Sequence, residues 1–391
     1  TATFTAANGQ GFFADTSSGG FTMNLPASPS AGNIVSVKDY DYSFGSNNLT
    51  VGRNGSPIGG QNVNDLTIST DGSALTFIYV DSTKGWLVIN ESTDTSQGVN
   101  PLFVAATGGT VTCCGNYKIH TFSSPGNFVV TCAGNSAGNN NIDYMVLAGG
   151  GGGGGGRGGG GGAGGFRESR HPCNASAWTA SPLASTTSLN LPAATYPITI
   201  GAGGAGGAGG CTRARGTSGS NTTLSSSITS AGGGGAGSEG TAPGIDGGSG
   251  GGAALGTVGA GNTPSVSPPQ GNPGSNGSGG PSGIPGVSAG GGGGATAAGT
   301  TNSRDGGAGA TTSISASPTA YAGGGGGAGN CVPGGSGGTG GGAAGAPPGT
   351  DPAASASANT GGGGGGGRGT VNRGTGGAGG SGLVIIRYKY Q

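Results

Sequence analysis

The sequence predicts an all-β protein with essentially no α-helix, in which a small β module precedes a layered bundle of polyglycine II helices. Three observations predict this fold class. Of the 103 glycines, 84 lie from Gly149 onward. Apolar, strand-like sequences at 142–147 and 383–388 bracket this glycine-rich part. Before it, short apolar runs alternate with turn residues, and no helical period of comparable length competes with them.

The N-terminal residues 1–105 read as a small β-sandwich or barrel used for attachment or oligomerisation. Phe77, Tyr79 and Trp86, together with the aliphatic positions, suffice to cover one compact β core. Turn residues separate the expected strands, which are 20–25, 34–38, 49–51, 65–68, 75–80 and 85–89.

Residues 106–148 are expected to form a β-hairpin connector. The alternating runs 117–122 and 127–131 are separated by 123–126, whose Ser-Ser-Pro-Gly sequence is a turn signal. We expect the closing strand 383–390 to pair with this hairpin group. The glycine-rich domain, 149–391, would then begin and end on one sheet, and its inserts would form a remote tip.

Glycine-rich sequence is more usually disordered, because glycine loses the most backbone entropy on folding and has no side chain to bury. Disorder needs no closing strand, however, and the glycine runs recur with similar lengths. They are 149–156, 158–162, 201–210, 232–235, 290–294, 323–327 and 361–367.

A glycine chain can instead adopt an extended threefold helix that has no internal hydrogen bonds, so its amides must bond to neighbouring helices. Without Cβ atoms such helices can approach closely on every side. A packed bundle is therefore favoured over disorder. Collagen is disfavoured because a strict Gly-X-Y period is absent, and silk-like material is a weaker alternative.

The charge distribution is asymmetric although the formal net charge is zero. Residues 1–148 carry nine acidic and four basic groups, and 149–391 carry five acidic and ten basic groups. Nearly all the latter are arginines, which suit bidentate binding of carboxylates and phosphates. The simpler interpretation is that these arginines provide solubility and hydrogen-bond exposed carbonyls at the ends of the bundle. Nucleic-acid binding is not supported, because the basic residues are neither clustered nor interleaved with aromatics.

The six cysteines lack the spacing of a zinc site, so no metal is expected. Disulfides joining Cys113 or Cys114 to Cys132, and Cys173 to Cys211, are compatible with the even count. Free thiols, including that of Cys331, are the alternative.

Neither catalysis nor a cofactor is expected. His120 and His171 are assigned to different modules, and no Ser/His/Asp or paired-carboxylate pattern is present. The glycine runs match nucleotide-binding patterns trivially, without the required Gly-Lys-Ser/Thr or strand–helix context. Asp39 and Asp41 alternate on one strand and are either calcium ligands or a solvated acidic edge.

Membrane insertion is not expected, because no window approaches 18 consecutive apolar residues. The first residues, Thr1 to Phe4, lack the basic and apolar regions of a signal peptide. The sequence leaves open whether a segment before Thr1 has been removed by cleavage.

Several segments together resemble a known family. Residues 143–148 followed by polyglycine, then 165–168, 196–204 and 382–388, look like the glycine-rich domain of bacteriophage tail-fibre proteins. The N-terminal segments resemble a β module of virion structural and fibre proteins of marine tailed phages; these segments are 25–29, 37–40 and 79–86.

The resemblance implies a virion fibre whose polyglycine II helices carry loops that contact a host surface glycan or outer-membrane protein. It also implies assembly with other fibre proteins and with itself, as a trimer in many fibres. The long inserts at 166–198 and 262–288 and the separate N-terminal module depart from compact tip adhesins. A repeating fibre subunit therefore remains open.

Receptor contacts are expected among the charged and aromatic groups of the glycine-rich part. Trp178 is the leading candidate, because aromatic faces bind sugars and cations and are enriched at interface hot spots. A tryptophan that plugs its own loop is the alternative. The full set is Arg167, Arg170, His171, Trp178, Arg213 and Arg215.

Two functions follow for testing, with a third less favoured. The first is a phage fibre that recognises a host surface, and it expects inserts clustered in space. The second is a non-receptor structural subunit, such as a capsid or neck fibre or an extracellular filament, that assembles through the β module. The third, an antifreeze or matrix protein, usually has a stricter tripeptide period.

Overall fold

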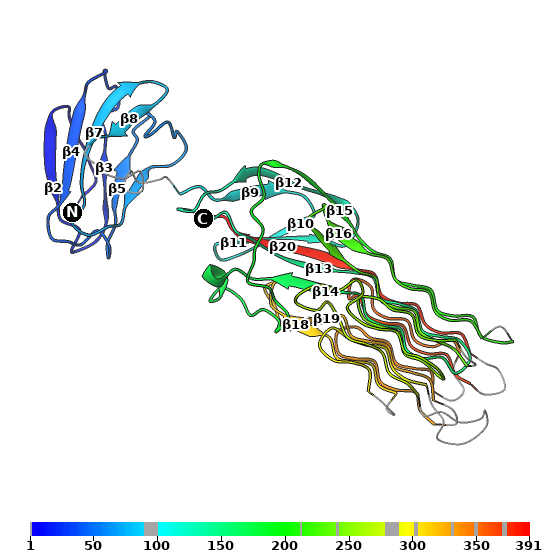
Figure 1. Ribbon diagram of the computed structural model, residues 1–391. Helices are drawn as coiled ribbons and strands as arrows, with labels where there is room; N and C mark the ends of the chain where they lie inside the picture. Colours follow the sequence, from blue (N-terminus) through cyan, green and yellow to red (C-terminus); the bar gives the residue numbers. More distant parts are fainter. Residues whose placement is uncertain are drawn as a thin grey trace. The chain divides into compact units, whose positions relative to one another are not determined.

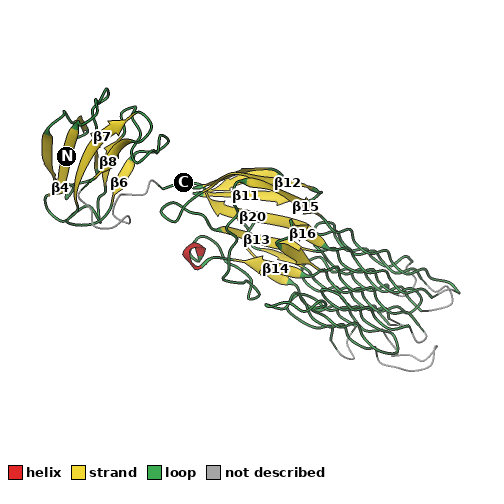
Figure 2. Cartoon of the chain, turned by 45° about the horizontal axis from the view of Figure 1, so that its top comes forward, coloured by secondary structure: helices red, strands yellow, loops and turns green. Residues whose placement is uncertain are grey.

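The chain folds into two compact β units (Figure 1). The computed structural model describes residues 2–89, 101–211, 213–239, 242–277, 289–300, 304–329, 332–347, 351–369 and 374–391. Unit 1 is Thr1–Leu102 with Gly134–Asn139, and unit 2 is Phe103–Ala133 with Asn140–Gln391. Regular structure within the described ranges is β-strand apart from one short 3-10 helix, Pro172–Asn174 (Figure 2). The predicted all-β class is confirmed.

Unit 1 contains two four-stranded sheets that share one core. The first sheet has the order β1 (Phe4–Thr5), β3 (Phe21–Asn24), β5 (Leu49–Gly52), β6 (Leu66–Ile68). The second has the order β2 (Gln10–Ala14), β4 (Ile34–Asp39), β7 (Ala74–Asp81), β8 (Gly85–Val88).

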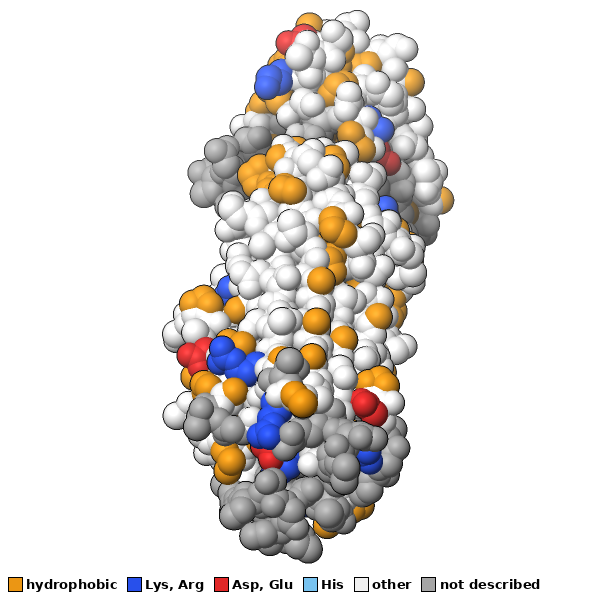
Figure 3. Space-filling view, turned by 90° about the vertical axis from the view of Figure 1, so that its right-hand side faces the viewer, with side chains coloured by type: hydrophobic (Ala, Val, Ile, Leu, Met, Phe, Trp, Pro, Cys, Tyr) orange, Lys and Arg blue, Asp and Glu red, His pale blue; other side chains and the backbone are white. Residues whose placement is uncertain are grey.

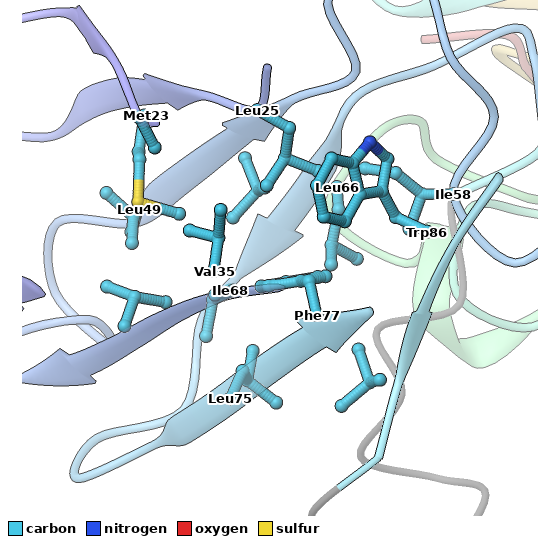
Figure 4. Close-up of a cluster of buried hydrophobic side chains, with 14 of the residues drawn as sticks. Met23, Leu25, Val35, Leu49, Ile58, Leu66, Ile68, Leu75, Phe77 and Trp86 are labelled. Atoms are coloured by element: carbon cyan, nitrogen blue, oxygen red, sulfur yellow. The ribbon is translucent and has the colours of Figure 1, made fainter. Parts of the chain in front are cut away.

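The core of unit 1 follows from alternation along the strands, since successive side chains of a strand face opposite sides of its sheet. In β4, Val35 and Val37 are buried and Ser36 between them is half-buried. Figure 4 shows Met23 and Leu49 from the first sheet in the same cluster as Phe77 and Trp86 from the second. All six strands predicted here form, and β1 and β2 are additional.

Asp39 organises the loop that follows β4. Its side chain accepts hydrogen bonds from the backbone N–H groups of Ser43 (3.2 Å), Phe44 (3.3 Å) and Gly72 (2.9 Å). Burial raises the pKa of Asp39, but these N–H donors outweigh it and hold the pKa below its usual value. Both oxygens of Asp39 face donors and the residue is 1% exposed, so neither the calcium nor the solvated-edge interpretation holds for Asp39. Asp41 is exposed and lies beyond the end of β4, so the two residues do not alternate on one strand.

Unit 2 is built around two five-stranded sheets. One sheet has the order β10 (Thr110–Cys114), β11 (Tyr117–Phe122), β20 (Leu383–Lys389), β13 (Ile142–Leu147), β14 (Phe166–Ser169). The other has the order β17 (Ile228–Ser230), β16 (Thr222–Leu224), β15 (Ala194–Thr199), β12 (Gly126–Ala133), β9 (Val104–Thr107). The predicted boundary after residue 105 falls inside β9, which belongs to unit 2.

Strands β13 and β20 are the centre of unit 2. They pair antiparallel from Ile142 opposite Tyr388 to Leu147 opposite Leu383, and β20 also pairs with β11. The prediction that the glycine-rich part begins and ends on one sheet is therefore confirmed. Every residue of β13 is buried, because one face packs on the second sheet and the other packs on the inserts and the hairpin of β18 (Ala310–Thr312) and β19 (Thr319–Tyr321).

The predicted hairpin between 117–122 and 127–131 is wrong. Strand β11 pairs with β10 and β20, whereas β12 pairs with β9 and β15 in the other sheet. The turn carries the chain from one sheet to the facing sheet, so that Phe122 and Phe128 both enter the core between them. A local turn signal specifies a reversal of direction and leaves the pairing partner open.

Beyond the sheets, the glycine segments run side by side without regular strand structure (Figure 2). Each backbone N–H from Gly149 to Gly165 donates to a carbonyl of a neighbouring segment or of the facing turn. The bonds rotate through three neighbours with a period of three residues. Gly149, Gly152 and Gly155 donate to Ser220, Thr217 and Ala214, whereas Gly150, Gly153 and Gly156 donate to Gly380, Gly377 and Gly374.

This period of three is the one expected for a polyproline II-type helix, which has three residues per turn. The segment 201–209 shows the same period in its burial. Gly201, Gly204 and Gly207 are buried, whereas Ala202, Ala205 and Ala208 are exposed. The alanines therefore mark the outward face of an edge segment.

Contact between the segments depends on the absence of Cβ atoms. A Cβ on Gly161 would lie 2.1 Å from the carbonyl oxygen of Gly151, and one on Gly150 would lie 2.0 Å from that of Gly362. Both distances are far inside van der Waals contact. The neighbours are backbone atoms with their own hydrogen bonds, so they cannot give way cheaply.

We predict that Gly161→Ala destabilises unit 2 by about 3 kcal/mol or more, because the added methyl group overpacks a site without free volume. Denaturant unfolding measures the change. Ala205→Ser is the matched control, since its extra atom points to solvent, and we expect a change within about 0.5 kcal/mol. Equal, small effects of both substitutions would contradict the packed bundle.

Candidate functional site

The six predicted contact residues lie at two ends of the glycine segments. The sheet end is where the segments join β13, β14 and β20, and the far end is where they turn back, as at 156–158 (Figure 1). Arg167, Arg170, His171 and Trp178 lie at the sheet end. Arg213 and Arg215 lie at the far end, beside Gly155. The structure therefore does not assemble them into one site.

The insert 166–198 folds back onto the sheet instead of forming a remote tip. Trp178 is only 6% exposed, and its Nε1–H donates to Oδ2 of Asp143 (3.4 Å). The Arg170 and Arg387 guanidinium groups each lie 5.9 Å from the Trp178 ring centroid. Trp178 thus packs within unit 2, and its burial removes it from the surface candidates.

Asp143 is the polar centre of this cluster. It is 0% exposed and accepts hydrogen bonds from the His171 backbone N–H (2.8 Å) and from the Asn174 side-chain amide (2.8 Å). Burial raises the pKa of Asp143, and these donors offset part of that rise. These hydrogen bonds fix the start of the insert to strand β13. His171 therefore has a structural role, because its backbone N–H is one of the donors.

Arg387, opposite Asp143 on β20, ties further segments to the sheet. Its Nη1 donates to the carbonyls of Ser313 and Ile314 (both 3.3 Å), and its Nη2 donates to that of Ala177 (3.4 Å). The guanidinium also lies 4.9 Å from the Tyr117 ring centroid. Neither Asp143 nor Arg387 was among the candidates, because a single charge within an apolar run carries no distinctive spacing.

The remaining described arginines of unit 2 lie at its far end. The backbone N–H of Arg157 donates to the carbonyl of Arg368 (3.1 Å). Arg304 lies nearby, because its carbonyl accepts from the Gly327 N–H (2.7 Å) and the next residue, Ala328, donates to the carbonyl of Gly158 (3.0 Å). The residues are Arg157, Arg213, Arg215, Arg304 and Arg368. Figure 3 shows Lys and Arg side chains gathered toward this end of unit 2. Arg373 lies outside the described residues.

Glu239 neutralises part of this charge. Its Oε1 lies 3.3 Å from Nη1 of Arg157 and its Oε2 lies 3.7 Å from Nη1 of Arg213. Arg157 lies in the turn between the glycine segments 149–156 and 158–162, where its backbone has a φ of 57°. Its side chain is buried, with 3% of the residue exposed. Arg213 is about one-third exposed, and Arg215 donates to the carbonyl of Pro243 (3.4 Å). Arg213 and Arg215 are therefore the candidates that face solvent here.

The five described cysteines are free. Cys113 and Cys114 lie on β10, whereas Cys132 lies on β12 in the other sheet. Cys173 belongs to the sheet end, where the His171 N–H bonds to Asp143, and Cys211 follows the segment 201–209, which runs from the sheet to the far end. That separation excludes the predicted Cys173–Cys211 disulfide. Cys331 lies outside the described residues.

Among the described residues, no group of three or more His, Cys, Asp or Glu side chains is arranged to hold a metal ion. No helix within the same ranges has the length and apolar character to cross a membrane. His120 and His171, assigned from sequence to different modules, both lie in unit 2.

The profile of the glycine-rich domain family matches residues 121–389, from β11 to the end of β20. No curated protein matches the chain.

Glu168 provides a test of the buried cluster at the sheet end. It is 2% exposed, Oε2 accepts from the Ser181 N–H (2.8 Å), and burial raises the pKa of Glu168 above its ordinary value of 4.5. A raised pKa means that the folded protein binds the proton more tightly. The resulting stabilisation is complete below pH 4.5 and is lost as the pH rises through the folded-state pKa.

We therefore predict that the stability difference between wild type and Glu168→Gln changes with pH in this window. The variant gains relative to the wild type as the pH rises from about 4.5 to 8, because it has no proton to lose. Thermal unfolding of both proteins across this range measures the difference. A constant difference would show that Glu168 is not held in a desolvating environment.

Proposed function

The chain belongs to the glycine-rich domain family, and we propose that it is a tail-fibre protein of a tailed bacteriophage whose glycine-rich unit carries host-contacting loops. Family membership and the hydrogen-bonded bundle indicate a structural, fibre-like role. We also propose that the segments are polyglycine II helices, which the threefold rotation of their hydrogen bonds supports.

The observation that carries the proposal is the concentration of arginines at the far end. Five described arginines meet three described carboxylates there, those of Glu239, Asp305 and Asp351. Within the 149–391 part, the remaining described arginines, Arg167, Arg170 and Arg387, lie at the sheet end. A far end that carries more arginines than carboxylates suits contact with an anionic surface.

The partner is a host surface glycan or an outer-membrane protein that presents carboxylate or phosphate groups. Arginine recognises these groups through paired, charge-assisted hydrogen bonds. Arg213 and Arg215 supply them, while Arg157 is committed to Glu239. The protein acts by binding, without catalysis, cofactor, nucleic acid or membrane insertion. Its location is the virion, or the extracellular medium after release.

Assembly with itself, as a trimer, and with other fibre proteins belongs to the same proposal. A non-receptor filament or capsid-fibre subunit is the second candidate, and one observation favours it. Phe13, Tyr40 and Tyr42 of unit 1 are 77%, 65% and 71% exposed. Exposed aromatic side chains in one unit are typical of protein contact surfaces.

Electron microscopy of the native particle tests the choice between these functions. An antibody raised against the segment 204–217, which contains Arg213 and Arg215, locates unit 2 on the particle, and a second antibody against unit 1 serves as the control. We expect the first label at the distal tip of a tail fibre and the second closer to the particle. Labels repeated along a shaft, or on the capsid, would overturn receptor contact in favour of a structural filament.

A further inference from the structure

Unit 2 contains a groove beside β14, the outer strand of its sheet. Its volume is about 280 Å³. Both long inserts contribute to it, the first through 183–189 and the second through Ser267 and Pro268. The other lining residues are Tyr144, Phe166, Arg167, Glu168 and Ile228. The groove lies at the sheet end, away from the far-end arginines.

The first insert is fixed to the sheet by backbone hydrogen bonds. Ser185 N–H donates to the Glu168 carbonyl and Arg170 N–H donates to the Ser185 carbonyl, both at 2.9 Å. Leu189 and Ile142 exchange two further backbone bonds at 3.0 and 2.9 Å. The wall formed by 183–189 is therefore held at both of its ends.

The second insert is fixed through Gln270, which is 1% exposed. Its Oε1 accepts from Ala231 N–H (2.9 Å), its Nε2 donates to the Pro264 carbonyl (2.8 Å), and its own carbonyl accepts from Phe166 N–H (2.8 Å). Pro268, two residues before Gln270, is thus held in place by the hydrogen bond between Gln270 and Phe166 of strand β14. Both walls are set by the fold, so the groove is preformed.

The groove holds one cation. Arg167 is half-buried, and its Nη1 donates to the carbonyl of Thr229 (3.3 Å). None of the ion pairs in the described part of the chain involves it. A partly desolvated guanidinium without a carboxylate partner favours an anionic ligand.

Tyr144 stands beside this cation. Tyr144 pairs with Ser169 and Val146 pairs with Arg167, which places Tyr144 and Arg167 on the same face of neighbouring strands. Burial raises the pKa of Tyr144 and the charge of Arg167 partly offsets the rise, as expected if the hydroxyl lies within the field of the guanidinium. Ser185, Thr187 and Ser188 add hydroxyl groups to the lining.

Glu168 adds a carboxyl group whose Oε2 accepts from the Ser181 N–H, and the remaining lining is apolar, with Leu183, Leu189, Ile228 and Pro268. A volume close to the lower end of ligand sites, roughly 300 Å³, fits a single ring-sized molecule. The lining therefore offers one cation, one carboxyl group, several hydroxyls and an apolar wall. A sugar ring has the matching groups, since it combines hydroxyls with an apolar C–H face.

We propose that this groove binds a monosaccharide that carries a carboxylate. The carboxylate pairs with Arg167, the ring hydroxyls bond to Tyr144 and the serine and threonine hydroxyls, and the ring carbons pack on Leu189, Ile228 and Pro268. The site is separate from the far-end arginines and independent of where the chain lies on a particle.

Isothermal titration calorimetry of the full chain with galacturonic acid and N-acetylneuraminic acid tests the proposal, with galactose as the neutral comparison. We expect at least one acid to bind at least ~10-fold more tightly than galactose, because hydrogen bonds to charged groups are the stronger ones. Absence of binding by both acids, or equal affinity for galactose, would overturn the proposal.

Variants assign the binding to the groove. Arg167→Ala is expected to weaken acid binding at least ~10-fold, and Tyr144→Phe about 3-fold or more. Lys84→Ala, the control, removes an exposed positive charge from unit 1 and should leave the affinity unchanged. Tyr144→Phe decides the outcome if Arg167→Ala fails to fold, as judged by thermal unfolding. Unchanged affinity in a folded groove variant, or an equal loss in Lys84→Ala, would reject this location.

Discussion

The hydrogen bond between a glycine N–H of one segment and a carbonyl of its neighbour is the interaction on which unit 2 depends. An extended threefold helix has no internal hydrogen bonds, so a buried segment must bond sideways or lose stability at every residue. The 149–165 hairpin meets this requirement at every N–H. The same residues are fully buried, and the carbonyl of Gly151 lies where a Cβ of Gly161 would stand. Glycine therefore provides order here, where its entropy cost would ordinarily oppose it.

This constraint separates the unit into regions with different chemistry. A core made of backbone has no place for side chains, so charged and aromatic groups collect at its two ends. At the sheet end they are buried: Asp143 and Arg387 join the inserts to the central strands. At the far end they close turns or face solvent, as Arg157 and Arg213 do around Glu239. The conventional apolar core is confined to the sheets that anchor the bundle.

The parts of the fold that sequence predicts well are those with a local physical signature. The run at 142–147 matches β13 to the residue, because a strand buried on both faces is mainly apolar, and Asp143 is the one charged residue of this strand. The hairpin at 117–131 fails because a turn does not specify which sheet receives the next strand. The prediction that Trp178 is a surface contact is wrong, because the sequence around an isolated aromatic residue in a polar insert does not indicate whether its side chain is buried. Ala202, Ala205 and Ala208 recur every three residues and are exposed, so their spacing in the sequence indicates the outward face of the segment 201–209.

Hydrogen exchange of the glycine amides, followed by NMR, tests the central claim most directly. A bundle bonded through its backbone predicts that the amides from Gly149 to Gly165 exchange only on global unfolding of unit 2, as slowly as those of β13 and β20. Exchange at the rate of an unstructured peptide in this segment, while β13 and β20 remain protected, would contradict the account.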